Sequence, residues 1–249
     1  MDPDKPPLAG KVALVTGAGR GLGREISLAL AAQGASLVLA GRDPDQLAEV
    51  GRLALRPGLN QTLTRPLDLG EPDQTTALAE AAAQAFGGLD IVVHAAGRGR
   101  PGSFLEAGPE AVWAMLRTRV WGAWLVTRAC LPLMAGRGGD VVFLAAVGQP
   151  DPAWAMRGVV LAGAEALAEA LRQELGRDAR WAGIRALTVR LHPPRSFPPE
   201  RANGLAPLPS QRRARRELAE TARRVALALT HPPEVAVREL VINAGEPGE

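Results

Sequence analysis

The sequence predicts one α/β domain over residues 1–249, with a doubly wound parallel sheet of about seven strands and helices on both faces. Three observations support this fold class. The chain has 249 residues, 47% of them hydrophobic, which is enough for one large core. Short apolar runs alternate with longer helical segments, as in repeated β-α-β units. The first apolar run turns through several glycines directly into a helix, which is how such sheets commonly begin.

The N-terminal half alternates strands with helices. Residues 12–15 (VALV) and 35–40 (ASLVLA) are apolar runs too short for helices, which predicts buried strands. The alanine-rich segment 74–86 is a predicted helix that ends at Gly87 and Gly88. The other predicted elements here are helices 24–33 and 44–55 and strands 62–67 and 91–94, with residues 1–9 as a flexible tail.

The C-terminal half continues the alternation. A helix over 109–134 carries apolar residues at helical spacing, and a helix over 158–175 has one apolar stripe. Six prolines between 193 and 209 exclude regular structure, so residues 192–210 are expected to form a proline-rich loop over the cleft. The remaining predicted elements are strands 141–145, 184–191 and 237–242 and a helix over 210–230.

The segment TGAGRGLG, residues 16–23, has the composition of a phosphate-binding turn. Gly17, Gly21 and Gly23 let the backbone bend sharply and approach a pyrophosphate where a β-carbon would obstruct it. The helix that follows directs its free N–H groups at that anion. The alternative is a glycine turn that binds nothing. The predicted cofactor contacts in this segment are Thr16, Gly17, Gly19, Arg20, Gly21, Leu22 and Gly23.

The end of the second predicted strand favours NADP(H) over NAD(H). An acidic residue that would hold the ribose 2'-hydroxyl of NAD is expected there, and the chain has Gly41 and Arg42 instead. Together with Arg20 in the glycine turn, Arg42 suits a 2'-phosphate. Alternatively, both arginines are solvated surface residues.

The spacing T-G-x-x-x-G-x-G resembles the motif of the short-chain dehydrogenase/reductase family, and the resemblance extends from Lys11 to about Gly245. It includes LVTRACLPLM, AEALAEALRQEL and the sequence His94-Ala95-Ala96-Gly97, which is similar to the family's N-N-A-G. The resemblance implies a Rossmann-like fold and oxidoreductase ancestry. It also implies that Asp68 contacts the adenine, and it adds further cofactor contacts at Leu69, Ala95, Ala96 and Gly97.

The resemblance fails at the catalytic positions. The family uses a serine after the fifth strand, Tyr-x-x-x-Lys on the next helix and an asparagine in the preceding helix. Alignment on AEALAEALRQEL places Arg157 at the tyrosine and Leu161 at the lysine. It places Ala145 or Ala146 at the serine and Arg119 at the asparagine.

The chain contains no tyrosine, and arginine is a poor general acid because it stays protonated. The sequence therefore predicts a pseudoenzyme, a non-catalytic nucleotide binder or a partner subunit.

Two other functions stay open. The first is an oxidoreductase reducing a carbonyl substrate, in which His94, Asp151 or His192 replaces the tyrosine, although His94 alone fits a hydrogen-bonded structural residue better. The second is an anion-sensing regulator that binds no nucleotide. Its anion, a carboxylate or a phosphate, would bind to arginines that otherwise face solvent separately: Arg98, Arg100, Arg157 and Arg195.

The resemblance also implies a homodimer or homotetramer through segments 109–134 and 158–175, or an assembly with an active relative. The hydrophobic surface expected there consists of Trp113, Trp121, Trp124, Val159, Val160 and Leu161, unless these residues belong to the core. The lone Cys130 cannot form an intramolecular disulfide, and the polar N-terminus lacks a secretory signal. We expect a cytoplasmic protein that binds no metal, no membrane and no nucleic acid.

Overall fold

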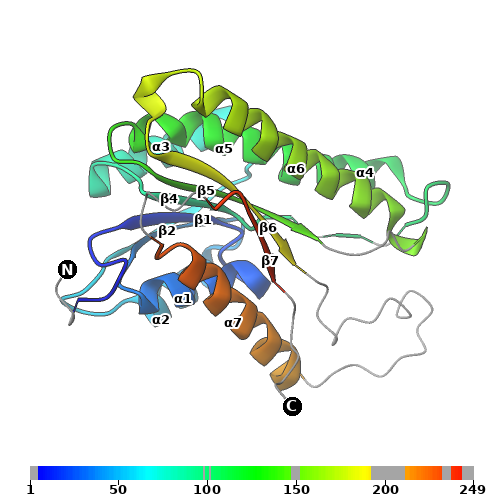
Figure 1. Cartoon of the computed structure of the whole chain (residues 1–249). Coiled ribbons are helices and arrows are strands. Elements are labelled where there is room, and N and C mark those ends of the chain that lie inside the picture. Colours follow the sequence, from blue (N-terminus) through cyan, green and yellow to red (C-terminus); the bar gives the residue numbers. More distant parts are fainter. Residues whose placement is uncertain are drawn as a thin grey trace, which may run out of the picture.

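The computed structural model of the protein describes residues 5–97, 99–100, 102–146, 152–191, 211–231 and 237–242. These residues form one seven-stranded sheet between two layers of helices (Figure 1). The strands are β1 (Val12–Thr16), β2 (Ser36–Gly41), β3 (Thr62–Pro66), β4 (Ile91–His94), β5 (Gly139–Ala146), β6 (Ile184–Leu191) and β7 (Glu239–Ile242). The helices are α1 (Gly21–Ala32), α2 (Pro44–Ala54), α3 (Pro72–Phe86), α4 (Pro109–Leu116), α5 (Gly122–Cys130), α6 (Ala155–Leu175) and α7 (Gln211–Ala228).

All neighbouring strands are parallel, in the order β3-β2-β1-β4-β5-β6-β7. This arrangement confirms the predicted doubly wound sheet and the single Rossmann-like domain. Chain order reverses between β1 and β4, so the carboxyl ends of these two strands flank the position where ligands bind in such sheets.

Buried side chains alternate between the two faces of the sheet. In β1, Ala13 and Val15 pack with α1, α2 and α7, whereas Val12 and Leu14 pack with α3, α5 and α6. Figure 1 shows these helix groups on opposite sides of the sheet. Because both faces are covered, the central strands read as continuous apolar runs, which is why the sequence identifies them. None of the helices in the described parts of the chain is both long and apolar enough to cross a membrane.

Two sequence predictions are wrong in detail. The helix expected over 109–134 is divided into α4, a π-helical turn Arg117–Trp121, α5 and a 3-10 turn Leu131–Met134. The tail expected over 1–9 is not free at its C-terminal end. Leu8 is buried in the core, and its backbone N–H donates to the Gln33 carbonyl at 2.8 Å. Leu8 covers the end of α1, which removes apolar surface from water.

The buried carboxylate of Asp90 links segments at the amino ends of the central strands. Asp90, just before β4, accepts hydrogen bonds from Lys11 Nζ at 2.9 Å, from the Val12 N–H at 2.9 Å and from Arg137 at 3.2 Å. Burial by itself raises the pKa of Asp90, but Lys11, Val12 and Arg137 outweigh burial and hold that pKa below its ordinary value. Asp90 therefore connects three segments at the edge opposite the ligand-binding ends.

We predict that Asp90→Asn lowers the free energy of unfolding by about 2–4 kcal/mol at pH 7, because it leaves Lys11 and Arg137 without a carboxylate. Since the folded-state pKa of Asp90 is depressed, its contribution is present above the unfolded pKa and is lost as pH falls through the folded value. Urea unfolding at pH 7 and pH 3 measures both effects.

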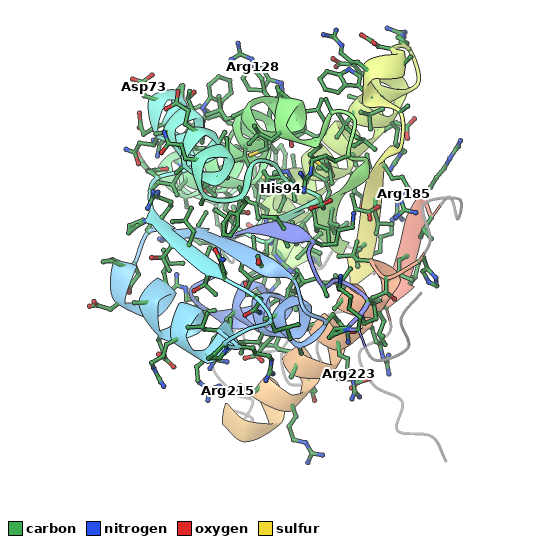
Figure 2. All side chains as sticks on the ribbon, turned by 90° about the vertical axis from the view of Figure 1, so that its left-hand side faces the viewer. Asp73, His94, Arg128, Arg185, Arg215 and Arg223 are labelled. Carbon is green, nitrogen blue, oxygen red and sulfur yellow. The ribbon has the colours of Figure 1, made fainter. Side chains whose placement is uncertain are left out.

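The control is Asp73→Asn, which removes an exposed carboxylate from the first turn of α3 (Figure 2). We expect this control to lower the free energy of unfolding by less than about 1 kcal/mol. Equal losses in the two variants would contradict the role given to Asp90.

Candidate functional site

Two glycines of the turn between β1 and α1, Gly17 and Gly23, lie so close to neighbouring backbone that a side chain has no room at either position. Gly17 has φ +66°, and a β-carbon there would lie 2.7 Å from the Ala96 Cα. A β-carbon on Gly23 would overlap the Gly17 carbonyl oxygen. The first turn of α1 contains no acidic residue, so its N–H groups and positive dipole end are available to an anion. The turn therefore has the geometry of a phosphate cradle.

Thr16 joins this turn to the segment after β4. Its hydroxyl donates to the Val93 carbonyl at 3.3 Å and accepts from the Ala96 N–H at 3.2 Å. The predicted contacts Ala95, Ala96 and Gly97 thereby lie beside the glycine turn, on the other side of the β1/β4 reversal. Two segments about 80 residues apart in the sequence form one continuous backbone surface.

Arg20 and Arg42 are both exposed at this end of the sheet. Arg20 immediately precedes α1, and Arg42 follows β2. The acidic residue next to Arg42, Asp43, accepts hydrogen bonds from the N–H groups of Asp45 and Gln46, both at 3.1 Å, and so caps α2. Asp43, the carboxylate nearest to Arg42 in the sequence, is thus engaged in the cap of α2. The exposed side chains Arg20 and Arg42 are both cationic. Gly19, Gly21 and Leu22 complete this segment, with Gly19 close to Gln46 of α2.

Asp68 and Leu69 follow β3. Leu69 is buried, while Asp68 accepts from the Gly70 N–H at 2.9 Å and pairs with Arg117 at 2.8 Å. Burial alone raises the pKa of Asp68, but the Gly70 N–H and the Arg117 guanidinium hold it below its ordinary value. The sequence analysis missed Arg117, which also pairs with Glu71. No sequence motif could have located this ion pair, because it joins residues 49 positions apart.

His94, the last residue of β4, is buried inside the fold (Figure 2). Its Nε2 lies 2.8 Å from the Thr127 hydroxyl, and its ring packs on Phe143 with centroids 4.8 Å apart. Burial lowers the pKa of His94 to about 3, so the imidazole is neutral at physiological pH. Because the Thr127 hydroxyl donates to the Ala123 carbonyl, the neutral ring donates its one N–H to Thr127, and it lacks the acidic proton of an imidazolium.

The positions aligned with the usual catalytic residues lie at the carboxyl ends of β4 and β5. The π-helical turn after α4 carries Arg119, whose guanidinium donates to the carbonyls of Gly97 at 3.2 Å and Leu144 at 3.4 Å. π-Helical turns of this kind are frequent at functional sites. Arg157 is in the first turn of α6, Leu161 is buried one turn later, and Ala146 ends β5.

Several predicted site residues lie outside the described residues: Arg98, Asp151, His192, Arg195 and the proline-rich loop 192–210. Arg100 is exposed, and its backbone N–H lies 3.3 Å from the Met115 sulfur. In the described parts of the chain, no group of three or more His, Cys, Asp or Glu side chains is placed to hold a metal ion.

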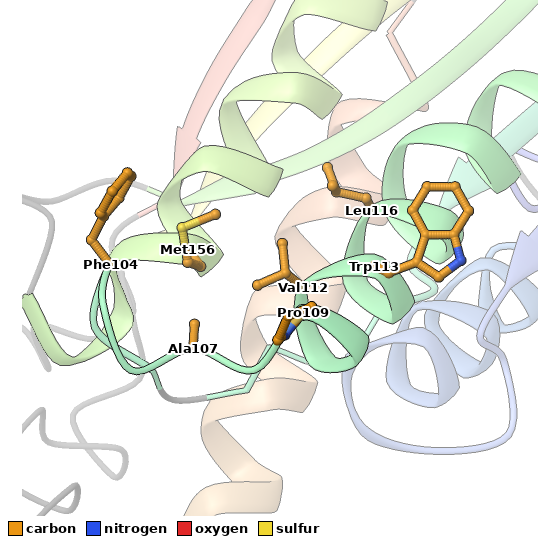
Figure 3. A pocket seen from close by; sticks show the side chains of 7 residues that line it. All are labelled: Phe104, Ala107, Pro109, Val112, Trp113, Leu116 and Met156. Atoms are coloured by element: carbon orange, nitrogen blue, oxygen red, sulfur yellow. The ribbon is translucent and has the colours of Figure 1, made fainter.

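An open apolar cavity of about 400 Å³ lies between the start of α4 and the start of α6 (Figure 3). Val112 and Met156 face it from the two helices, and Phe104 closes one side (Figure 3). The three tryptophans of segment 109–134 are exposed, at 62% for Trp113, 42% for Trp121 and 40% for Trp124. Val159 is also exposed, but Val160 and Leu161 are buried within this chain, so the prediction that they supply surface is wrong. Both belong to the buried residues of α6, together with Ala164, Ala168 and Leu171.

Comparison with known proteins agrees with this geometry. The family model for short chain dehydrogenases matches residues 11–190, so the chain belongs to this family. A short-chain type dehydrogenase/reductase of Mycolicibacterium smegmatis is 33% identical over 156 residues, which are 56% of this chain and 55% of that protein. This chain thus spans little more than half the length of that relative.

Solved structures share the fold. A metagenomic short-chain oxidoreductase in complex with NADP superimposes with a TM-score of 0.77 at 24% identity, covering 96% of this chain and 100% of the other. Carveol dehydrogenase from Mycobacterium avium in complex with NAD gives a TM-score of 0.80 at 22% identity, covering 96% and 98%. Both nucleotides therefore occur on this scaffold.

We predict that His94 makes stability sensitive to pH. Because its folded pKa of about 3 lies below the unfolded value of 6.5, only the unfolded chain gains a proton as pH falls below 6.5. Stability is therefore lost between pH 6.5 and about 3. Between pH 7.5 and pH 5, we expect His94→Asn to reduce the loss in the free energy of unfolding by up to about 2 kcal/mol.

Urea unfolding of both proteins at the two pH values measures this difference, and an NMR titration of the imidazole measures the pKa directly. An imidazole at position 94 that titrates between pH 5 and 8 would refute the assignment.

Proposed function

We propose that this chain binds NADP(H) and has lost the usual proton-transfer chemistry of its family, so that it acts as a non-catalytic binder or as a partner subunit. The observation that carries the proposal is the combination of an intact nucleotide cradle with Arg157 and Leu161 at the positions of the family's tyrosine and lysine. A bound nicotinamide would supply a hydride. The chain's own residues offer no phenol to accompany that hydride with a proton.

The cradle fits a dinucleotide. Gly17 and Gly23 leave space that a β-carbon would fill, and the start of α1 presents N–H groups to a pyrophosphate. Arg20 and Arg42 support a preference for the 2'-phosphate of NADP(H), since Asp43 is engaged in capping α2. Asp68 would reach the adenine only from within its ion pair with Arg117.

The residues at the positions of the family's tyrosine and lysine support the loss of proton transfer. Arg157 holds its proton at any physiological pH, and the buried Leu161 can neither bond a ribose hydroxyl nor tune a neighbour. Positioned acid/base catalysis contributes about 10²- to 10⁴-fold to rate. The alternative, an oxidoreductase with a substitute acid, is weakened for His94 because that ring is neutral and bonded to Thr127.

The proposal includes an assembly through α4, α5 and α6. Exposed Trp113, Trp121 and Trp124 with Val159 give these helices an apolar outer face, and such faces commonly mark interfaces. A homodimer, a homotetramer or a complex with an active relative would cover it. A cytoplasmic location is also part of the proposal, in keeping with the free, buried Cys130 thiol.

We predict that calorimetry detects NADPH binding and that Arg42→Ala weakens it by about 10- to 100-fold while changing NADH affinity little. The reason is that a charge-assisted bond to the 2'-phosphate contributes about 1.5–3 kcal/mol. Arg52→Ala, which removes an exposed arginine at the other end of α2, is the matched control and should bind NADPH normally. Equal affinity of the unchanged protein for NADH and NADPH would count against the preference.

We predict that the purified protein does not oxidise NADPH with ketones, aldehydes or acyl thioesters above the rate of the uncatalysed mixture. The matched variant carries Arg157→Tyr, Leu161→Lys and Ala146→Ser together, and we expect a measurable gain in NADPH oxidation from it. Absorbance at the nicotinamide band follows both reactions, and NADPH binding by each protein verifies folding. Turnover by the unchanged protein at rates typical of enzymes, about 1 s⁻¹ or more, would overturn the proposal.

A further inference from the structure

Two arginines from different helices meet the same short segment after β4. Arg119 packs its side chain against Gly97, where any β-carbon would overlap its Cγ. Arg157 packs against Gly99, and a β-carbon there would lie 2.5 Å from its Cδ. Both side chains are half-buried. The backbone at 97 and 99 thus brings two guanidinium groups to the carboxyl ends of β4 and β5, on the β4 side of the glycine turn.

Neither guanidinium has an anionic partner within the part of the chain that the structure describes. Arg119 donates only to two backbone carbonyls, and Arg157 lies over the Trp154 ring at 5.7 Å. Other half-buried arginines in the same parts of the chain are paired with carboxylates, for example Arg117 with Asp68 and Arg185 with Asp140. Within the described residues, Arg119 and Arg157 are thus the half-buried arginines that have no carboxylate partner.

The electrostatic cost of this arrangement is evident in both groups. Burial lowers the pKa of Arg119 to about 10, and the positive charge of Arg157 contributes to the shift. Burial also lowers the pKa of Arg157. Both remain protonated at neutral pH, so two like charges are held with reduced hydration. Such charges are stable in proteins when an anion compensates them.

We propose that Arg119 and Arg157 together bind an oxyanion of a small-molecule ligand, a carboxylate or a phosphate. Planar guanidinium groups match both anions through paired N–H donors, and each of these two has donors that no described residue accepts. The inference deepens the proposed function and rests on it, because it assigns an acidic ligand to the same cleft. The role proposed for these two positions is electrostatic recognition of an anion, in place of the family's acid/base step.

This site is separate from the one expected for the cofactor's own phosphates. The pyrophosphate site is at the β1–α1 turn, and the 2'-phosphate site is near Arg20 and Arg42 after β2. Arg119 and Arg157 lie on the other side of β1, after β4 and β5. A ligand that contacts both Arg119 and Arg157 would therefore lie where a substrate is expected, away from the phosphates of the cofactor.

Thermal unfolding of the full chain without nucleotide tests the site. Sodium phosphate, sodium succinate and sodium chloride are titrated at constant ionic strength. We expect phosphate or succinate to raise Tm saturably, by about 3–6 °C at ten times Kd, and chloride to leave it unchanged. A response to phosphate alone that both arginine variants below abolish identifies a phosphoryl ligand at this site, and such a response to succinate alone identifies a carboxylate. No saturable response to either anion would overturn the proposal.

Variants test whether Arg119 and Arg157 are responsible for the anion-dependent rise in Tm. Arg119→Gln and Arg157→Gln should each abolish the anion-dependent rise. Arg157→Gln should also raise Tm in chloride, because it removes one of two uncompensated charges, whereas a purely structural arginine would lower Tm when replaced. Arg128→Gln is the matched control: Arg128 lies over Trp124 at 5.6 Å, as Arg157 does over Trp154, but points outward from α5 (Figure 2).

The control should keep the full response, and an undiminished rise in both glutamine variants would refute the site. Nucleotide binding is measured separately with NADPH. An anion response in a protein that does not bind NADPH would reject the nucleotide proposal and leave the anion site in place.

Discussion

The close approach of the β1–α1 turn to the segment after β4 is the constraint on which the site depends. Gly17 lies against Ala96, Gly23 lies against Gly17, and Thr16 hydrogen-bonds across the gap. Since no side chain fits there, the turn stays open to a pyrophosphate and the two central strands end at a common level. Gly97, against which Arg119 packs, directly follows this contact.

Under the proposed function, this cradle is combined with chemistry unlike that of the family. A tyrosine tuned by a lysine exchanges a proton, whereas two arginines exchange none and attract negative charge. The substitutions at 119 and 157 have the same sign and meet at the same glycine segment. Under the two proposals made above, this agreement corresponds to a change of task at the site, from proton transfer to charge recognition.

Much of the fold and part of the site could be predicted from the sequence. Continuous apolar runs identified the strands because both faces of the sheet are covered. The glycine spacing predicted the tight β1–α1 turn, in which a β-carbon at Gly17 or Gly23 would overlap neighbouring backbone. The π-helical turn at 117–121 could not be predicted, since no proline or glycine lies within it. The pairing of Arg117 with Asp68, the burial of Leu8 and the meeting of Arg119 with Arg157 are tertiary contacts that leave no periodic signal.

The carboxylate Asp90 fastens its neighbours at one rim of the sheet, while the cradle and the arginine pair occupy the other rim. Substitutions at the ligand-binding ends of the strands therefore leave the contacts of Asp90 intact. This arrangement separates the residues that stabilise the sheet from those that would determine its ligand. Under the proposed function, it accounts for a chain that lacks the family's catalytic side chains and still folds as its relatives do.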